Sequence, residues 1–573
     1  MNEKKWPGIG SQGVGLPGVG WPGLGIIALA LLASVTGIAN RFAYDDLPIV
    51  LLNDRIHHLG SAWRLFGQPY WSKEYGGGLY RPLTTALFSV EWAVGGGSPL
   101  PFHVLNIVLY VLIALAVYAV ARRVLPTSAA WLAAALFAVH PVHVEAVGNV
   151  VGQSELLAAL FVVGAVAVYL SRRMADPAAE LSGRTIATVT GLYALGMLSK
   201  EHAITLPGLL LVAEATVIAD ARPWRERVRA VRLTGLVLAA TGLAFLWVRG
   251  QVIGDVVGDT PAMELQTLHW SERAWTMLGV VPDWVRLFVW PARLVAAYSP
   301  PQTMVWRTFD QELVPGLVVL LALVALAVAA RRRLPVAAFG IGWTAVAMLP
   351  ISNLIVRSGV LLAERTLFLP SVGVALTAGA VAMVAAARLA GAPKLARQGG
   401  MAGVVLLLGA GAWRSATRQL VWRDDAALFG SGVRDAPLSY EAHYLWGREL
   451  EGEGQPDSAK HELWLALRLS DNDPRVPYAL GLEYFNAGNC HVAEPLFVKT
   501  LELYPRNLNA RLQLSDCYVR EQNYVALRGV ARGGMAWWIR PGLFRHVELV
   551  ADSAVRSGGR YRPGPQDLKP TKQ

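Results

Sequence analysis

The sequence predicts an all-α, polytopic membrane protein that ends in a stack of helical repeats. Of its 573 residues, 54% are hydrophobic and 16% are charged, and long apolar runs alternate with clusters of basic residues. A period of 34 residues near the C-terminus predicts the stack. The net charge of +11 does not indicate nucleic-acid binding, because the basic residues separate apolar runs and are not interleaved with aromatic residues.

Apolar runs long enough to cross a bilayer, about 17 to 25 residues each, predict eleven transmembrane spans. They lie at 23–40, 102–121, 128–147, 153–170, 185–199, 203–219, 232–249, 312–330, 335–351, 366–387 and 400–416. The basic clusters between them place the N-terminus in the cytoplasm, so an odd number of spans places the region after 418 outside. We expect segment 270–291, with its spaced charges, to be an interfacial or re-entrant helix.

The spans define the expected domains. These are a disordered, Gly/Pro-rich cytoplasmic tail at 1–22, a membrane domain at 23–417 with outer loops at 41–101 and 250–311, a connector at 418–440, an outer repeat domain at 441–555 and a disordered tail at 556–573. The first span is a candidate signal peptide, but cleavage near Ala43 would leave the acidic residues that follow on a frayed terminus. We therefore expect the first span to be retained.

The C-terminal repeat follows equivalent residues. Tyr444 and Gly447 recur as Tyr478 and Gly481, Gly454 recurs as Gly488, Ala459 as Ala493 and Leu467 as Leu501. A 34-residue period with small residues where helices cross is the signature of tetratricopeptide repeats, and about three repeats are needed for a continuous core. The period predicts a fold, whereas the partner that such a stack binds stays open.

The only two cysteines, Cys490 and Cys517, both lie in this repeat region. Adjacent antiparallel helices can bring them together as a disulfide in an oxidising compartment. The alternative, two separate small residues in the core, is the one that we expect.

Two adjacent carboxylates, Asp45 and Asp46, follow the first span directly. Ionisable groups at the rim of a membrane are costly enough to indicate function, so we expect one of them to act as a general base and the other to orient it. The alternative is a solvated acidic loop.

Three cations lie on the same predicted outer face: Arg81 in YRPL of the first outer loop, and Lys200 in SKE and Arg365 in AERT at span ends. Arg offers a fork of donors that suits phosphate, so we expect the three to bind a phosphate group. The alternative is that they are anchors that extend to the membrane surface.

Other polar residues at the same face are expected to form a network that lines a cavity. They are Tyr80, His103, Asn106, His140, His143, Glu145, Glu155, Glu201, Asn353 and Glu364. Imidazole and carboxylate are zinc ligands, but Pro141 and the uneven spacing of His140, His143 and Glu145 give them no common face. We therefore predict no metal site, and a divalent metal ion remains the less favoured alternative.

The motifs occur in a recognisable order: DD, YRPL, FHxxN, FAVHPVHVEAV, GxxELLA, SKE, WVRLFVWPARLVAAYS, PISN and AERTLFLPS, followed by the repeats. This order, from about Phe42 onward, resembles the transmembrane and tetratricopeptide-containing O-mannosyltransferases and their bacterial relatives. The resemblance implies the GT-C glycosyltransferase fold, a polyprenyl-phosphate-linked sugar donor and transfer to protein hydroxyls, with Asp45 and Asp46 in the acidic motif that carries catalysis. Gln153 stands where the family would carry Arg, which shifts phosphate binding toward Arg81, Lys200 and Arg365.

The resemblance therefore implies an enzyme of class EC 2.4.1 that transfers mannose or another hexose to Ser or Thr of secreted proteins. The Ala/Val/Arg-rich composition suggests a bacterial inner membrane, with undecaprenyl phosphate as the lipid and the periplasm outside. Expected partners are the bilayer, the lipid-linked donor and an acceptor protein or peptide held by the repeats, with no cofactor beyond the donor. The alternatives are a lipid-linked oligosaccharide ligase or polymerase, and a non-catalytic envelope scaffold.

Overall fold

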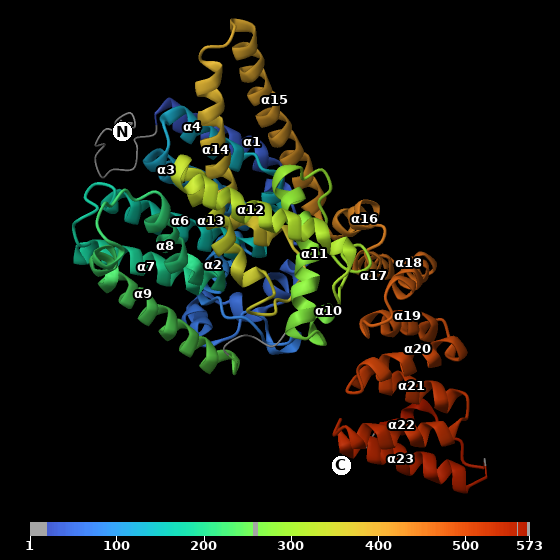
Figure 1. Cartoon of the computed structure of the whole chain (residues 1–573). Coiled ribbons are helices and arrows are strands. Elements are labelled where there is room, and N and C mark those ends of the chain that lie inside the picture. The colour runs from blue at the N-terminus through green and yellow to red at the C-terminus, as the bar shows by residue number, and fades with distance from the viewer. Residues whose placement is uncertain (1–19, 256–261, 559, 570–573) are drawn as a thin grey trace. The chain divides into compact units, whose positions relative to one another are not determined.

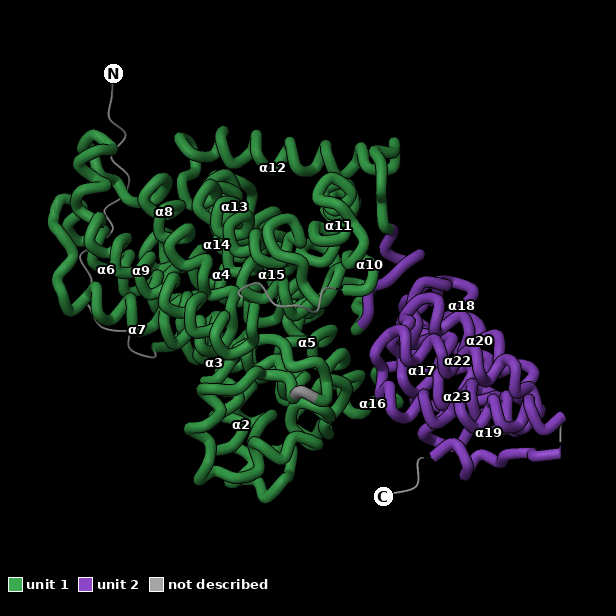
Figure 2. Tube along the Cα trace, turned by 90° about the horizontal axis from the view of Figure 1, so that it is seen from below, with its two compact units in different colours: residues 1–296, 305–428 green, residues 297–304, 429–573 purple. Residues whose placement is uncertain are grey.

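The computed structural model describes residues 20–255, 262–558 and 560–569. Within these residues the regular elements are all helices, which confirms the all-α class. The chain divides into two compact units (Figure 2). Unit 1 comprises Met1–Ala296 and Val305–Leu428, and unit 2 comprises Ala297–Met304 and Phe429–Gln573. Most of the predicted disordered tail at 1–22 lies outside the described residues, and the first helix begins at Trp21.

Unit 1 contains the apolar helices (Figure 1). They are α1 (Trp21–Ser34), α2 (Pro82–Gly95), α3 (Leu100–Val124), α4 (Thr127–Ala138), α5 (Val144–Gly148), α6 (Gln153–Arg173), α7 (Gly183–Ser199), α8 (Leu206–Thr216), α9 (Trp224–Ile253), α10 (Met263–Gln266), α11 (Trp270–Val289), α12 (Val314–Arg333), α13 (Pro335–Met348), α14 (Phe368–Leu389) and α15 (Lys394–Gln419). Short 3₁₀ or π turns join several of them.

Seven helices among the described residues are long and apolar enough to cross a membrane, or eight if a pair bent by 47°, Thr127–Ala138 with Pro141–Gly148, forms one span. The chain is therefore a multi-pass membrane protein. Three predicted spans correspond to shorter helices, because α7 has 17 residues, α8 has 11 and α13 has 14. The total of eleven spans stays a prediction.

Helix ends in unit 1 follow the sequence signals. Helix α3 has a proline in its first turn and Arg122 and Arg123 in its last turn. Proline fits the first turn because its missing N–H has no partner there, and basic residues near a span end favour the polar side of the membrane. Pro126 then separates α3 from α4.

Glycine on both helices permits a close contact between α13 and α14. A methyl group added at Gly340 of α13 would overlap the carbonyl oxygen of Gly373 in α14, and the reverse substitution would overlap the Gly340 carbonyl. Small residues allow helix backbones to approach in this way within a membrane. By contrast, only 11% of the apolar window of α12 is buried, so lipid is the natural cover for this helix.

Unit 2 is a succession of helices, each packed against the next (Figure 1, red end). They are α17 (Tyr440–Gly452), α18 (Pro456–Leu469), α19 (Arg475–Asn486), α20 (Cys490–Leu503), α21 (Leu508–Arg520), α22 (Tyr524–Ala536) and α23 (Pro541–Arg556), preceded by α16 (Asp425–Asp435) in the expected connector. A Cβ atom at Gly447 would lie 2.9 Å from the Leu463 side chain, and one at Gly481 would lie 2.9 Å from Phe497. Gly481 and Phe497 each lie one period after Gly447 and Leu463, so the same close contact recurs and requires glycine at the same position of each repeat. The tetratricopeptide assignment stays a prediction.

Segment Ala297–Met304 belongs to unit 2 although it was expected in an outer loop of the membrane domain. The Ser299 and Ser439 hydroxyls lie 2.8 Å apart, and the Tyr440 N–H donates to the Pro300 carbonyl oxygen at 3.2 Å. These hydrogen bonds join the segment to the start of α17, a pairing that the sequence did not signal.

The predicted disorder at 556–573 is wrong for the described residues 560–569. Leu568 is buried within the core of the last helices, and the His546 ring nitrogen lies 2.9 Å from the Asp567 carbonyl oxygen. One apolar side chain therefore fixes a polar segment whose composition suggests a free tail.

Cys490 and Cys517 form a disulfide, with their Cα atoms 5.3 Å apart. The expectation of two separate buried thiols is wrong. The bond joins the first residue of α20 to α21, so it crosses from one repeat to the next.

We expect replacement of both cysteines by serine to lower the free energy of unfolding of unit 2 by about 3 kcal/mol, because the disulfide closes a loop in the unfolded chain. Chemical denaturation of the full-length protein, followed by proteolysis of the C-terminal helices, measures the change. Thiol labelling without reductant is the control. Two reactive thiols in the native wild-type protein would contradict the disulfide.

Candidate active site

The acidic loop, residues 40–53, is anchored at its beginning by the chain after α15. The Arg41 N–H donates to the Arg423 carbonyl oxygen at 2.9 Å, and the Tyr44 N–H donates to Asp425 Oδ1 at 2.6 Å. Tyr44 has a φ of 56°, a left-handed conformation that few non-glycine residues adopt. This turn places Asp45 and Asp46 in different surroundings, although they are adjacent in sequence.

Asp46 is bound by the backbone. Its carboxylate accepts hydrogen bonds from the N–H groups of Ala43 at 3.2 Å, Val150 at 3.3 Å and Val151 at 2.9 Å, and only 1% of the residue is exposed. Burial raises the pKa of Asp46 to about 8, and the three N–H groups oppose that rise. Asp46 therefore fixes the acidic loop to the turn that precedes α6.

Asp45 is the more accessible carboxylate, with 20% of its side chain exposed. Its Oδ2 lies 3.6 Å from Nη2 of Arg365. Burial raises the pKa of Asp45 above its ordinary value. The positive charges of Arg365, Arg81 and Lys200 oppose this rise, in that order. The three predicted phosphate-binding cations thus act on one carboxylate.

Arg365 is held by Glu145, a carboxylate 220 positions away in the sequence. The Arg365 N–H donates to Glu145 Oε2 at 2.8 Å, and Nη1 donates to Oε1 at 2.5 Å. Glu145 has no exposed surface. The partner expected from sequence proximity, Glu364, instead accepts the N–H of Val295 at 2.5 Å. One carboxylate therefore orients both the backbone and the guanidinium of Arg365.

Arg81 and Lys200 also have carboxylate partners. Arg81 donates from Nε at 3.0 Å and from Nη2 at 2.7 Å to the two oxygens of Glu201. Although burial raises the pKa of Glu201, Arg81 holds it well below its ordinary value. Lys200 Nζ pairs with Glu155, whose second oxygen lies 3.4 Å from His202 Nδ1. The structure thus separates Lys200 from its sequence neighbour Glu201 and pairs each with a distant residue.

The remaining predicted residues bind the protein's own backbone or other side chains. The Tyr80 hydroxyl donates to the Phe66 carbonyl oxygen, and the Asn106 amide donates to the carbonyl oxygens of Val147 and Asn149. The Asn353 side-chain oxygen accepts the Ser358 N–H. The His140 ring faces the Phe288 carbonyl oxygen, and the His143 ring lies between the Tyr110 and Ser371 hydroxyls. His103 is an exception: it is buried, with 1% exposed, and its ring makes no hydrogen bond to the described residues. Asn106 satisfies backbone carbonyl groups at the break between α5 and α6.

The two histidines and Glu145 do not converge on one point, since each has a different partner. Among the described residues, no group of three or more His, Cys, Asp or Glu side chains is arranged to hold a metal ion.

Three residues near the site were missed by sequence reasoning or differ from expectation. The buried Arg249 of α9 lies 4.0 Å from Glu201, and the ring of Tyr70 lies under the Arg81 guanidinium at 5.0 Å. A single Arg or Tyr carries no spacing signal, so the sequence offered no way to find them. Gln153 is fully buried, and its amide nitrogen donates to Glu91 at 2.7 Å.

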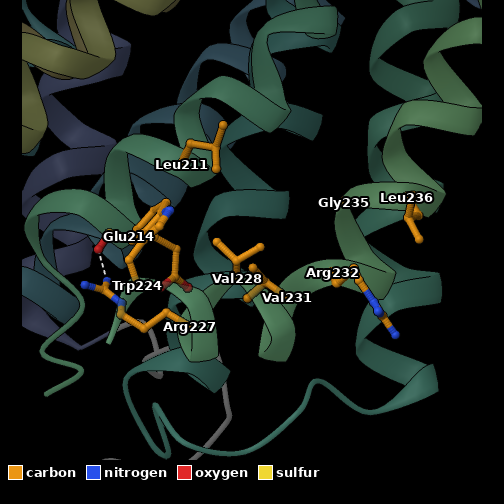
Figure 3. A pocket seen from close by; sticks show the side chains of 9 residues that line it. All are labelled: Leu211, Glu214, Trp224, Arg227, Val228, Val231, Arg232, Gly235 and Leu236. Atoms are coloured by element: carbon orange, nitrogen blue, oxygen red, sulfur yellow. Dashed lines mark hydrogen bonds and ion pairs between the residues drawn. The ribbon is translucent and has the colours of Figure 1, made fainter. Parts of the chain in front are cut away.

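A separate pocket of about 270 Å³ lies between α8 and α9 (Figure 3). None of the predicted site residues lines it; its lining consists of Leu211, Glu214, Trp224, Arg227, Val228, Val231, Arg232, Gly235 and Leu236. Glu214 accepts two hydrogen bonds from Arg173, which has no exposed surface. Part of a predicted cytoplasmic basic cluster is therefore a buried ion-pair network.

No protein-family model matches the chain. The protein O-mannosyl-transferase TMTC4 of Homo sapiens is 28% identical over 490 residues, which cover 75% of this chain and 64% of that protein. The protein O-mannosyl-transferase Tmtc3 of Drosophila melanogaster is 26% identical over 543 residues, which cover 81% and 56%. The chain spans less than two thirds of the length of these relatives.

Among solved structures, an oligosaccharyltransferase of Archaeoglobus fulgidus, tethered with an acceptor peptide, aligns with a TM-score of 0.43 and 16% identity over 78% of this chain and 59% of that chain. ArnT of Cupriavidus metallidurans, bound to undecaprenyl phosphate, aligns with a TM-score of 0.39 and 15% identity over 84% and 80%. The sequence similarities agree with the resemblance drawn from the motifs: the chain is similar to the TMTC protein O-mannosyl-transferases.

Proposed function

We propose that the chain is a GT-C glycosyltransferase that transfers a sugar, mannose or another hexose, from a polyprenyl-phosphate-linked donor to Ser or Thr hydroxyls of proteins. One observation carries the proposal: the partly exposed Asp45 carboxylate lies beside Arg365, and Arg81 and Lys200 also act on it. A base next to a cluster of cations suits a reaction in which a hydroxyl loses a proton while a phosphate departs.

In the proposed reaction, Asp45 accepts the proton of the acceptor hydroxyl as the hydroxyl oxygen attacks the anomeric carbon of the sugar. The bond between that carbon and the phosphate oxygen breaks, and its electron pair leaves with the polyprenyl phosphate. The leaving phosphate gains negative charge, which Arg365, Arg81 and Lys200 stabilise. No external oxidant or co-reactant is needed.

Asp45 suits the role of base better than Asp46. All three hydrogen bonds that Asp46 accepts come from backbone N–H groups, so its oxygens are already engaged. Asp45 has a single ion pair at 3.6 Å and keeps part of its surface exposed. Asp46 is therefore the positioning residue of the pair.

The paired carboxylates support rather than cancel the phosphate role of the cations. Glu145, Glu201 and Glu155 each hold one cation from a different segment of unit 1. Such pairs fix the donor groups before the substrate arrives, so no reorganisation is needed as charge develops in the transition state.

We place unit 2 and the acidic loop outside a bacterial inner membrane. The positive-inside pattern supports this orientation, and the Cys490–Cys517 disulfide suits an oxidising compartment such as the periplasm. In this arrangement unit 2 presents the acceptor protein, since its described helices pack in succession as expected of a repeat stack with an extended binding surface.

The proposed role of Asp45 as the base can be tested by removing its carboxylate. Asp45→Asn should lower the transfer rate by roughly 10² to 10⁴-fold, the usual contribution of general base catalysis. Burial raises the pKa of Asp45, so the wild-type rate should rise with pH through a pKa above the ordinary range for Asp, as the carboxyl loses its proton. This rise should be missing in Asp45→Asn, measured with undecaprenyl-phosphate mannose and an acceptor peptide.

Asp46→Asn is the matched variant, because it changes the neighbouring carboxyl by the same substitution. It should lower the thermal unfolding temperature, since the amide nitrogen replaces one carboxylate oxygen and cannot accept the backbone hydrogen bond from Val150 or Val151 that this oxygen receives. Wild-type transfer by Asp45→Asn would remove Asp45 as the base.

The proposed phosphate-binding role of Arg365 and Lys200 can be tested by substitution with alanine. Arg365→Ala or Lys200→Ala should weaken donor binding by roughly 10 to 100-fold, the value of a hydrogen bond to a charged group, and change acceptor affinity little. Arg64→Ala removes an exposed cation from the outer loop at 41–101 and is the control. If both site variants bind the donor as the wild type does, the phosphate site lies elsewhere.

The proposed role of unit 2 in presenting the acceptor protein can be tested by deletion. Deletion from Glu441 onward should leave donor binding intact while transfer to a full-length acceptor protein falls by roughly tenfold or more, because the proposed acceptor-presenting surface is gone. Transfer to a short peptide is the control for the membrane domain, because the deletion removes most of the unit to which segment Ala297–Met304 belongs. Normal transfer to the full-length acceptor would assign unit 2 to assembly instead. Transfer of the sugar to a polysaccharide only would favour the oligosaccharide ligase.

A further inference from the structure

Tyr70 has a buried hydroxyl group that the proposed reaction does not yet use. The residue is 2% exposed, and its hydroxyl has no hydrogen-bond partner among the described parts of the chain. Buried tyrosine hydroxyls usually have a partner, because an unmade hydrogen bond costs about 1 to 3 kcal/mol. By comparison, the hydroxyl of Tyr80 donates to the Phe66 carbonyl oxygen at 2.8 Å.

The position of Tyr70 is fixed by its backbone and by its ring. Its N–H donates to the Leu79 carbonyl oxygen at 2.8 Å, which pairs the segment with the residues that lead to Arg81. The Arg81 guanidinium lies over the ring at 5.0 Å from its centroid. The aromatic side chain therefore supports a proposed phosphate-binding cation and faces the same site.

The charges around Tyr70 are those of the proposed site. Burial raises the pKa of the Tyr70 hydroxyl, so this group keeps its proton at neutral pH. Besides Arg81, the charged groups that act on it are Asp45, Asp46 and Arg365. A neutral hydroxyl in this position can donate a hydrogen bond to an anion without adding charge to the site.

Two neighbouring residues also have buried polar atoms that lack hydrogen-bond partners in the part of the chain that the structure describes. Gln68 Oε1 and Ser72 Oγ are also buried atoms without a hydrogen-bond partner among the described residues. Three unpaired polar groups thus occur within five residues of one segment, 68–72, beside Arg81. Arg81 itself uses Nε and Nη2 for Glu201, and its Nη1 makes no hydrogen bond to the described residues.

We propose that the Tyr70 hydroxyl donates a hydrogen bond to the phosphate group of the polyprenyl-linked sugar donor, next to Nη1 of Arg81. The inference rests on the proposed function and adds a binding residue to it. Phosphate is the fitting partner because its oxygens can accept from the hydroxyl and from the guanidinium together. The hydrogen bond strengthens as the phosphate gains charge on leaving the sugar.

Tyr70→Phe tests the inference, because it removes one oxygen atom and keeps the ring under Arg81. Tyr75→Phe is the control, since Tyr75 is 46% exposed and lies in the same loop. The binding constants of the full-length variants are measured for undecaprenyl phosphate, undecaprenol and inorganic phosphate. We expect Tyr70→Phe to bind undecaprenyl phosphate roughly tenfold more weakly, with undecaprenol binding unchanged and with Tyr75→Phe like the wild type.

The outcomes separate this inference from the proposed function. Equal binding of undecaprenyl phosphate by Tyr70→Phe and the wild type, both preferring it to undecaprenol, overturns only the role of Tyr70. A wild-type protein with no preference for undecaprenyl phosphate over undecaprenol overturns the proposed function, and this inference with it. Loss confined to inorganic phosphate overturns the lipid-linked source. The rise in unfolding temperature on adding undecaprenyl phosphate reports the same contact if the variant is less stable.

Discussion

The pair formed by Glu145 and Arg365 is the interaction on which the site depends. Glu145 is fully buried, and it binds both the backbone N–H and the guanidinium of Arg365. Removing one partner of a buried ion pair leaves an uncompensated charge, which costs about 3 to 5 kcal/mol. Because the same guanidinium faces Asp45, the pair links the acidic loop, the bent third span and the turn before α14. The other two cations repeat the scheme with Glu201 and Glu155.

Several residues that resemble catalytic groups serve the backbone of broken helices. The third span bends by 47° between α4 and α5, which frees carbonyl groups at membrane depth. The Tyr110 hydroxyl lies 3.1 Å from the Phe137 carbonyl oxygen and 3.0 Å from that of Ala138, next to the bend. Asn106 donates to the carbonyls at 147 and 149. Such groups need partners inside the protein because the bilayer offers none.

Local signals in the sequence were sufficient for the all-α class, the membrane character and the repeat. Apolar runs and a 34-residue period are visible within short windows, and the glycine contacts to Leu463 and Phe497 show their physical cause. The sequence indicated the residues of the proposed site but not how they pair. Arg81, Lys200 and Arg365 pair with carboxylates 120, 45 and 220 positions away, which no spacing rule reveals. Adjacent Glu364 was a plausible partner for Arg365, yet it binds the backbone of Val295.

The segment Ala297–Met304 gives the repeat stack a fixed beginning. Ser299 accepts the Glu441 N–H at 3.1 Å, and Pro301 forms a bridge with Ser439, so the backbone that opens α17 is already occupied. The Ser299–Ser439 contact joins residues 140 positions apart in the sequence, across the whole C-terminal half of the membrane domain. In a solenoid each repeat contacts only its neighbours, so this long-range pairing makes the order of the first repeat depend on a segment outside the repeat array.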